Sequence, residues 1–108
     1  MIPVKDFKRE VAGWAAEIGV SPREIHVREM RRKWASCSSR GRLTFSFALL
    51  NRPLEERALA IVHELLHLRY PSHNRMFKSM MAAYLRRIGI DLSNLELGGP
   101  EFIAEVLD

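Results

Sequence analysis

The most constraining feature of the sequence is a long apolar stripe of helical periodicity that stops at a proline. Between residues 54 and 70, apolar side chains recur at the three- and four-residue spacing of a helix. The members of this stripe are Leu54, Ala58, Ile61, Val62, Leu65 and Leu68. Pro53 fits the first turn of a helix, and Pro71 ends the helix because a proline disfavours the helical conformation of the residue before it. These features predict a helix over residues 54–69.

The segments on either side of this helix predict two more helices and three short strands. A helical pattern over residues 5–18 ends at Gly19, and a second one begins with Ser72 as its cap and ends at Gly89. The strands are expected at residues 24–30, 33–37 and 43–49. The predicted fold class is therefore α+β: an N-terminal helix, a small three-stranded and mostly antiparallel sheet, two further helices, and an extended C-terminal tail.

Length and composition place these elements in one soluble domain. The chain has 108 residues, of which 47% are hydrophobic and 28% charged, as is ordinary for a globular protein. Its longest uncharged run, residues 43–51, is far shorter than the roughly 20 residues needed to cross a bilayer, and its charged N-terminus lacks the apolar core of a secretory signal. We therefore expect a cytoplasmic protein without a membrane partner. The sequence carries no signal for a particular oligomeric state.

The sequence His-Glu-Leu-Leu-His at residues 63–67 gives the predicted helix a metal-binding motif. Histidines four residues apart lie on the same face of a helix, so His63 and His67 can bind one zinc ion. Glu64 lies one step round the helix and can take a proton from a zinc-bound water as that water attacks a carbonyl. Because the chain has one cysteine, Cys37, a thiolate zinc site is excluded. The motif predicts a zinc-dependent peptidase with one Zn²⁺ per chain and a polypeptide substrate.

A catalytic zinc site needs a third protein ligand, and His73 is the candidate. It follows His67 by six residues, beyond the Tyr70-Pro71 break, where a bend can aim it at the metal. The reserve candidates are Glu96, Glu101 and Glu105. The same six-residue step occurs in metzincins, but Tyr70 stands where that pattern has its glycine. A metzincin-like peptidase is therefore the alternative within this class.

Several motifs occur in one order along the first 88 residues and together resemble a known family. They are Arg32-Lys33-Trp34-Ala35-Ser36-Cys37-Ser38, the strand after Gly41, His63-Glu64-Leu65-Leu66-His67 and His73-Asn74-Arg75-Met76-Phe77. The combination resembles the minimal gluzincin-type zinc peptidases (minigluzincins) and related domains with a Trp-Gly-Ser-Cys-Ser signature. In this chain, Ala35 stands in place of the glycine of that signature. The resemblance implies a gluzincin-like fold, with His63, His67 and His73 as zinc ligands and Glu64 as the general base.

The strand over residues 43–49 is the expected binding surface for the substrate. In the architecture that the resemblance implies, an edge strand above the zinc pairs with an extended peptide. The candidate residues are Thr44, Phe45, Ser46 and Phe47. The alternative is a central strand that has no free edge.

A second class of function is a nucleic-acid-associated module. The net charge is +4, and basic residues concentrate around the first hairpin. They are Arg28, Arg31, Arg32, Lys33, Arg40 and Arg42. Trp34 is the one aromatic residue among them, so base stacking has little support and a solvated basic face is the favoured interpretation. A nucleic-acid partner is the alternative to a peptide substrate.

Gly98-Gly99-Pro100 separates a predicted catalytic domain, residues 1–97, from a C-terminal tail, residues 98–108. The tail alternates acids with large apolar residues, so it can occupy a cleft that accepts peptides, and one of its carboxylates can take the open zinc position. The candidate inhibitory residues are Glu101, Glu105 and Asp108. The resemblance implies the same arrangement, because minigluzincins look like latent enzymes that their C-terminal segments hold inactive. We therefore expect a zymogen.

Overall fold

The computed structural model describes residues 1–91 and has the predicted α+β class. The first helix, α1 (Val4–Ile18), buries the apolar stripe that its sequence predicts, including Phe7 and Val11. Gly19 ends the helix with a φ of 82°, a left-handed conformation that glycine adopts without strain. The inner face of the helix reaches the sheet, where the Phe7 ring packs edge-on against Phe45 at 5.1 Å between centroids.

The sheet contains β1 (Glu24–Arg28), β2 (Ala35–Cys37) and β3 (Arg42–Ser46) in the order β1-β3-β2. β2 and β3 are antiparallel, whereas β1 runs parallel to β3. The sheet is therefore mixed, and the expectation of a mostly antiparallel sheet holds for one of its two strand pairs. The physical reason is that the chain reverses direction between β1 and β2 and again in the β2–β3 turn, so β3 has the same direction as β1.

Two features of the sheet depend on a turn or a cap rather than on strand periodicity. Gly41 closes the β2–β3 turn with a φ of 88°, and a Cβ atom there would lie 3.2 Å from the Arg23 side chain. The third strand stops at Ser46, three residues earlier than predicted, because a 3-10 helix, η1 (Phe47–Asn51), begins there. The hydroxyl of Ser46 caps that helix by accepting a hydrogen bond from the Ala48 amide at 3.2 Å.

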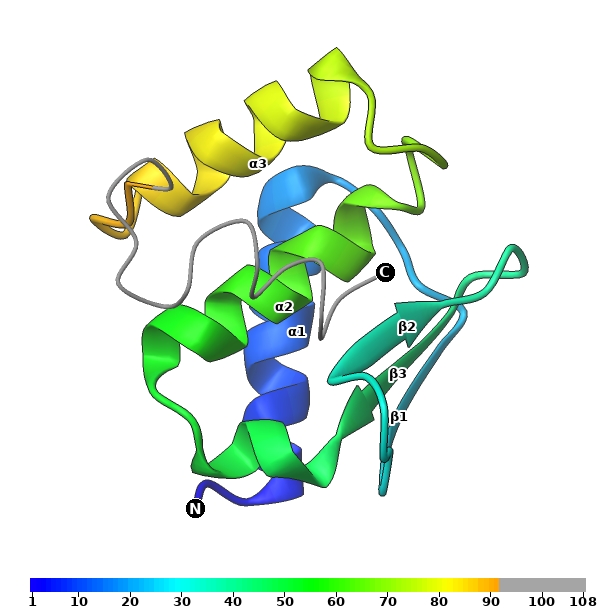
Figure 1. Cartoon of the computed structure of the whole chain (residues 1–108), viewed down its shortest axis with the longest axis vertical. Helices are drawn as coiled ribbons and strands as arrows, with labels where there is room; N and C mark the ends of the chain where they lie inside the picture. The colour runs from blue at the N-terminus through cyan, green and yellow to red at the C-terminus, as the bar shows by residue number, and fades with distance from the viewer. Residues whose placement is uncertain (92–108) are drawn as a thin grey trace.

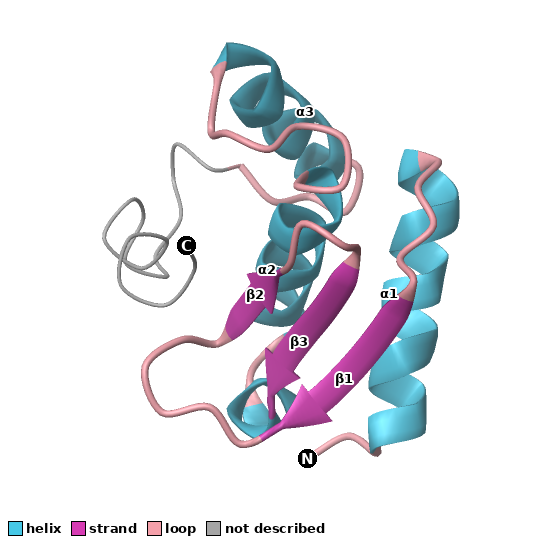
Figure 2. Ribbon diagram, turned by 90° about the vertical axis from the view of Figure 1, so that its right-hand side faces the viewer, coloured by secondary structure: helices cyan, strands magenta, loops and turns pink. Residues whose placement is uncertain are grey.

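The central element is α2 (Leu54–Leu66), which packs against α1, α3, β2 and η1. Figures 1 and 2 show α1 and α2 on the same side of the sheet, with α3 above them. Arg57 of α2 donates hydrogen bonds to both carboxylate oxygens of Glu10 in α1, at 2.9 and 3.0 Å, and this bidentate pair fixes the two helices against each other. Every residue from Ala58 to Leu66 is buried, so α2 forms the centre of the core.

The last helix, α3 (Arg75–Arg86), begins later than the sequence predicts. Asn74, and not Ser72, is its N-cap: the Asn74 side chain accepts a hydrogen bond from the Phe77 amide at 2.8 Å. Asparagine and serine cap helices about equally well, so spacing alone could not separate the two positions. Within residues 1–91, no helix combines the length and the apolar composition of a membrane span. The tail and its predicted boundary at Gly98 lie outside the described residues.

Candidate metal centre

Three histidines that the sequence predicts as ligands come together where α2 ends and the chain turns into α3. One nitrogen from each of His63, His67 and His73 lies within 4.8 Å of the other two. The ring centroids are 4.8–5.0 Å apart, and the Nε2 atoms of His67 and His73 are separated by 3.0 Å. The structure therefore brings together the two residues of the helical motif and the candidate third ligand.

His63 and Glu64 form the buried side of this cluster. His63 is 1% exposed and Glu64 is fully buried. The Glu64 carboxylate lies 2.8 Å from His63 Nδ1, and a carboxylate at that distance favours the tautomer with its proton on Nδ1. The Nε2 atom of His63 is then the nitrogen that carries the lone pair. Glu64 thus orients a neighbouring ring and also places a carboxylate inside the cluster.

His67 occupies a tightened last turn of α2. The amides of residues 67, 68 and 69 donate to carbonyls three residues earlier, as in a 3-10 helix, so the regular helix ends one residue before the second histidine. The Nδ1 atom of His67 lies 3.2 Å from the Tyr70 carbonyl, which leaves Nε2 to face His73. Backbone carbonyls are common partners of ligand imidazoles, because they fix the ring and its tautomer.

His73 comes from the loop before α3, one residue before the Asn74 cap, and its side chain is exposed. The sequence analysis, with Ser72 as the cap, placed His73 in the helix. That placement was wrong, because the helix starts two positions after His73. Phe77, in the first turn of α3, supports the cluster from beneath: its ring centroid is 5.2 Å from that of His63, 4.8 Å from His67 and 5.0 Å from His73. The cluster therefore rests on an apolar floor that α3 supplies.

The donor set fits a zinc ion. Three neutral imidazoles are typical zinc ligands, with bonds of about 2.0–2.1 Å, and tetrahedral geometry then separates two ligand nitrogens by about 3.3–3.4 Å. The 3.0 Å between the Nε2 atoms of His67 and His73 is close to that separation, and the third nitrogen is within 4.8 Å of both. Small side-chain movements would complete the geometry, and a tetrahedral ion would keep a fourth position for water or substrate.

The predicted substrate strand is the main correction at the site. β3 is the central strand of the described sheet, paired with β1 on one side and β2 on the other. Thr44, Phe45 and Ser46 therefore cannot offer a free strand edge, and Phe47 has already entered η1. The edge strand that packs against α2 is β2. Sequence periodicity identifies a half-buried strand but does not determine its neighbours.

The remaining candidates are Tyr70, Arg75 and Tyr84, which the sequence offers as residues that could stabilise the oxyanion of the reaction, and four acidic residues beyond residue 91. Tyr70 is half-buried and provides its carbonyl to His67, Arg75 is exposed at the start of α3, and Tyr84 is buried beneath the Arg87 guanidinium, 4.9 Å from the centre of its ring. The reserve ligands and tail residues lie outside the described part of the chain: Glu96, Glu101, Glu105 and Asp108.

Two contributors to the site were not predicted, namely the Phe77 floor and the Tyr70 carbonyl. The four-residue spacing of His73 and Phe77 is a signal that could have suggested the first. The basic residues are also distributed differently from the prediction. Arg28 ends β1, with Arg31, Arg32 and Lys33 just beyond it, whereas Arg40 and Arg42 lie at the other end of the strands (Figure 1).

Comparison with known proteins identifies the family of the chain and a solved structure of similar fold. The family described as "YgjP-like, metallopeptidase domain" matches residues 4–90. Among solved structures, the chain is similar to the metallopeptidase zymogen of Pyrococcus abyssi abylysin, with a TM-score of 0.63 and 23% identity over 69% of this chain and 75% of that one. No curated protein sequence matches significantly. The family match and the shared fold confirm the expected resemblance to minimal zinc metallopeptidases.

Proposed function

Because the chain belongs to the YgjP-like metallopeptidase family, we propose that it hydrolyses peptide bonds with one zinc ion, held by His63, His67 and His73. The observation that carries this proposal is the convergence of three imidazole nitrogens within 4.8 Å beside a fully buried glutamate. A closed structural zinc site would have four protein ligands and no use for that carboxylate. The donor set and the acid together support an open, catalytic site.

The proposed chemistry divides between the metal and the chain. When bound, zinc would polarise a carbonyl and lower the pKa of a water molecule. Glu64 accepts the proton of the attacking water and passes it to the leaving amine, a role for which its place beside His63 suits it. Burial of Glu64 and His63 excludes bulk water from one side of the reaction, so the carboxylate acts in surroundings of low polarity.

The substrate class is an extended polypeptide. β2 is the strand at the edge of the sheet next to α2, the helix that carries the motif. A peptide that adds to a sheet edge is held through its backbone, so its side chains need not be of one kind. This edge replaces β3, which the sequence analysis had favoured, and it supports an endopeptidase.

Removal and return of the metal test the proposed function. Treatment with a chelator should abolish cleavage of a quenched fluorescent peptide, and one equivalent of zinc should restore it, because the three histidines can polarise no carbonyl by themselves. Initial rates before and after each step provide the measurement, and circular dichroism shows that the fold survives chelation. Cleavage that persists at full rate in the folded, metal-free protein would contradict the proposal.

We further infer that residues 98–108 inhibit the site and that residues 1–97 form the catalytic domain. The family match ends at residue 90, and the tail carries three acids among large apolar residues. A tethered segment competes with free substrate at an effective concentration on the order of millimolar. The similar abylysin structure is that of a zymogen, which adds weight to this proposal.

Ending the chain after Leu97 should therefore raise peptide hydrolysis at equal zinc content, most strongly at low substrate concentration. A full-length control with Glu101→Gln, Glu105→Gln and Asp108→Asn tests whether the carboxylates are responsible. If they bind the metal, this control should also be activated; if only the apolar residues block the cleft, it should stay latent. A shortened protein that is folded, zinc-loaded and no more active than the whole chain would show that the tail is not an inhibitor.

A further inference from the structure

A groove of about 620 Å³ lies beside the metal cluster, with His67 as part of its wall. Three segments far apart in the sequence enclose it. They are the α1–β1 connection at Val20 and Ser21, the β2–β3 turn from Ser38 to Gly41, and the chain after α2 from His67 to Pro71. A substrate with its reacting bond at the histidines would therefore place a neighbouring side chain in or beside this groove.

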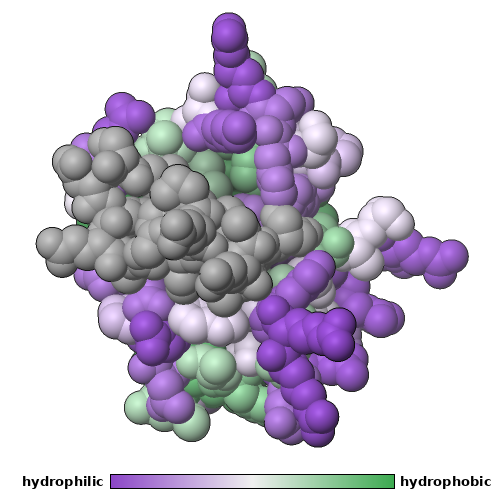
Figure 3. Space-filling view, viewed as in Figure 1, coloured by the Kyte–Doolittle hydropathy of each residue, from purple (hydrophilic) through white to green (hydrophobic). Residues whose placement is uncertain are grey.

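A second hollow, of about 410 Å³, continues the groove around the β2–β3 turn. Ser38 and Arg40 line both spaces, and the second one leads to Arg23 and Arg42. In Figure 3, hydrophilic residues gather over the sheet and the β2–β3 turn on the face that also carries α2 and α3. The two spaces thus form one polar surface that extends outward from His67.

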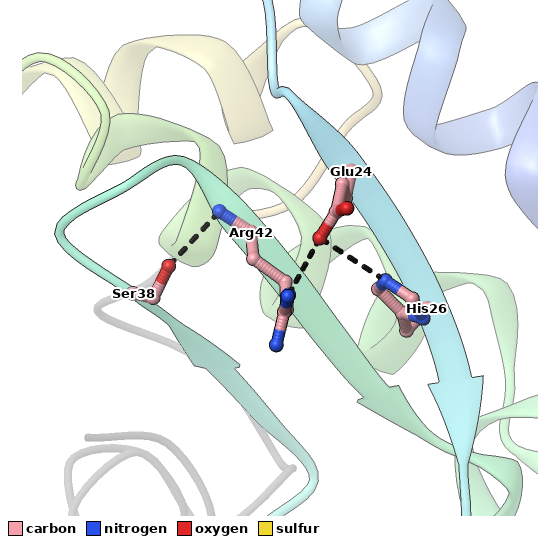
Figure 4. A network of polar contacts seen from close by, with 4 residues as sticks. All are labelled: Glu24, His26, Ser38 and Arg42. Carbon is pink, nitrogen blue, oxygen red and sulfur yellow. Dashed lines mark hydrogen bonds and ion pairs between the residues drawn. The ribbon is translucent and has the colours of Figure 1, made fainter.

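The charge of this surface is positive and largely uncompensated. Among residues 1–91, the groove beside His67 has Arg40 and Arg69 in its wall and no acidic residue. In the second hollow, Glu24 accepts a hydrogen bond from Arg42 at 2.6 Å (Figure 4). That bond, with a smaller contribution from His26, holds the pKa of Glu24 below its ordinary value. Glu24 is therefore committed to Arg42 and does not neutralise its neighbours.

The remaining arginines are available to a ligand. Among residues 1–91, no carboxylate forms an ion pair with Arg23, Arg40 or Arg69. Arg69 is nevertheless held in place, because its Nη2 atom donates a hydrogen bond to the Gly19 carbonyl at 3.1 Å. Its other guanidinium N–H groups keep their hydrogen-bonding capacity, and an arginine fork matches the geometry of a carboxylate.

We propose that this groove is a specificity subsite in which Arg40 and Arg69 bind an acidic side chain of the peptide. This inference rests on the proposed peptidase function. A Glu or Asp near the scissile bond would form charge-assisted hydrogen bonds there, whereas a Gln of the same size would form weaker, neutral ones. Because the arginines are exposed, the preference should decrease as the salt concentration rises.

The experiment uses the zinc-loaded full chain and a set of quenched fluorescent decapeptides. A single Glu or Gln is moved through the four positions on each side of the central bond. At one position, the Glu peptide should have a kcat/KM about tenfold higher than that of the Gln peptide, mainly because its KM is lower. Arg40→Gln should remove most of that ratio and Arg40→Lys should retain part of it. Arg9→Gln, which removes an exposed charge from α1, should leave the ratio unchanged.

A binding measurement separates this proposal from the peptidase proposal. Fluorescence anisotropy with the Glu64→Gln variant reports the affinity for labelled Glu and Gln peptides without any turnover. Equal kcat/KM values for all Glu and Gln peptides would overturn the acidic subsite while hydrolysis itself stands. Arg40-dependent binding of the Glu peptide, without hydrolysis by the wild-type protein or by the chain that ends after Leu97, would support the subsite and refute the peptidase.

Two further outcomes would overturn the subsite. One is that the protein binds the labelled Glu and Gln peptides equally well, or binds neither of them at millimolar concentration. The other is Arg40-dependent binding of a labelled ten-nucleotide single-stranded DNA together with no preference for the Glu peptide. That result would assign the positive groove to nucleic acid, the partner that the basic residues offered as an alternative.

Discussion

Glu64→Gln should lower peptide hydrolysis by a factor on the order of 10²–10⁴ and leave the metal bound. Glutamine has nearly the shape of glutamate, and its carbonyl oxygen can still accept a hydrogen bond from His63 Nδ1, which lies 2.8 Å from the carboxylate. It cannot accept the proton of the attacking water. The measurement is kcat/KM on a quenched peptide, with zinc content determined on the same sample.

Glu55→Gln is a matched control for this experiment. Glu55 lies in the first turn of the same helix, and its side chain is exposed. The control should keep wild-type activity and zinc content, because its carboxylate is remote from the histidines. Full turnover by a zinc-loaded Glu64→Gln protein would exclude Glu64 as the base. Thermal unfolding of both variants shows whether the buried substitution has disturbed the core.

His73→Ala should reduce the zinc content of the purified protein well below one ion per chain. His63 and His67 would remain as a two-ligand site, and catalytic zinc sites in proteins need three protein ligands to retain the ion. Elemental analysis gives the stoichiometry, and competition with a chromophoric chelator gives the change in affinity. Because His73 is exposed and lies in a loop, the substitution should leave the fold intact.

The chain provides its own control in His26, the one histidine outside the cluster. It is exposed on β1, where it lies 3.4 Å from the Glu24 carboxylate. His26→Ala should bind as much zinc as the wild-type protein. Undiminished zinc in His73→Ala would remove His73 from the ligand set and direct attention to Glu96 or to the tail.

The parts of the site that are local in sequence were predictable, because helical spacing alone brings them together. Apolar periodicity located α2, and the four-residue step placed His63 and His67 on one face. The position of His73 depended on which polar residue caps α3, and two neighbouring candidates of similar capping strength made this uncertain by two residues. The sequence thus indicated the three histidines but not the loop that presents the third.

Features that depend on contacts between distant segments were not predictable. The alternation of Leu43 and Phe45 identified β3 as half-buried, yet only its pairing with both β1 and β2 shows that it is central. The groove beside His67 requires segments around Ser21, Arg40 and Arg69 to meet, and no local pattern encodes that meeting. Strand order is a property of the whole chain, so the prediction of a substrate-binding edge on β3 was wrong.

The mixed sheet has a consequence for how the molecule assembles. The β2–β3 hairpin and the histidine cluster each form from residues close together in sequence, whereas β1 must pair with β3 across the intervening hairpin. Loop closure over longer separations is slower, and the Glu10–Arg57 pair between α1 and α2 spans 47 positions, so we expect β1 to join β3 before α1 packs against α2. Arg23, whose amide donates to the Gly41 carbonyl at 2.9 Å, would be fixed when the sheet closes. Because synthesis proceeds from the N-terminus, a nascent chain could therefore assemble the sheet that positions Arg23 and Arg40 before its metal ligands have been added.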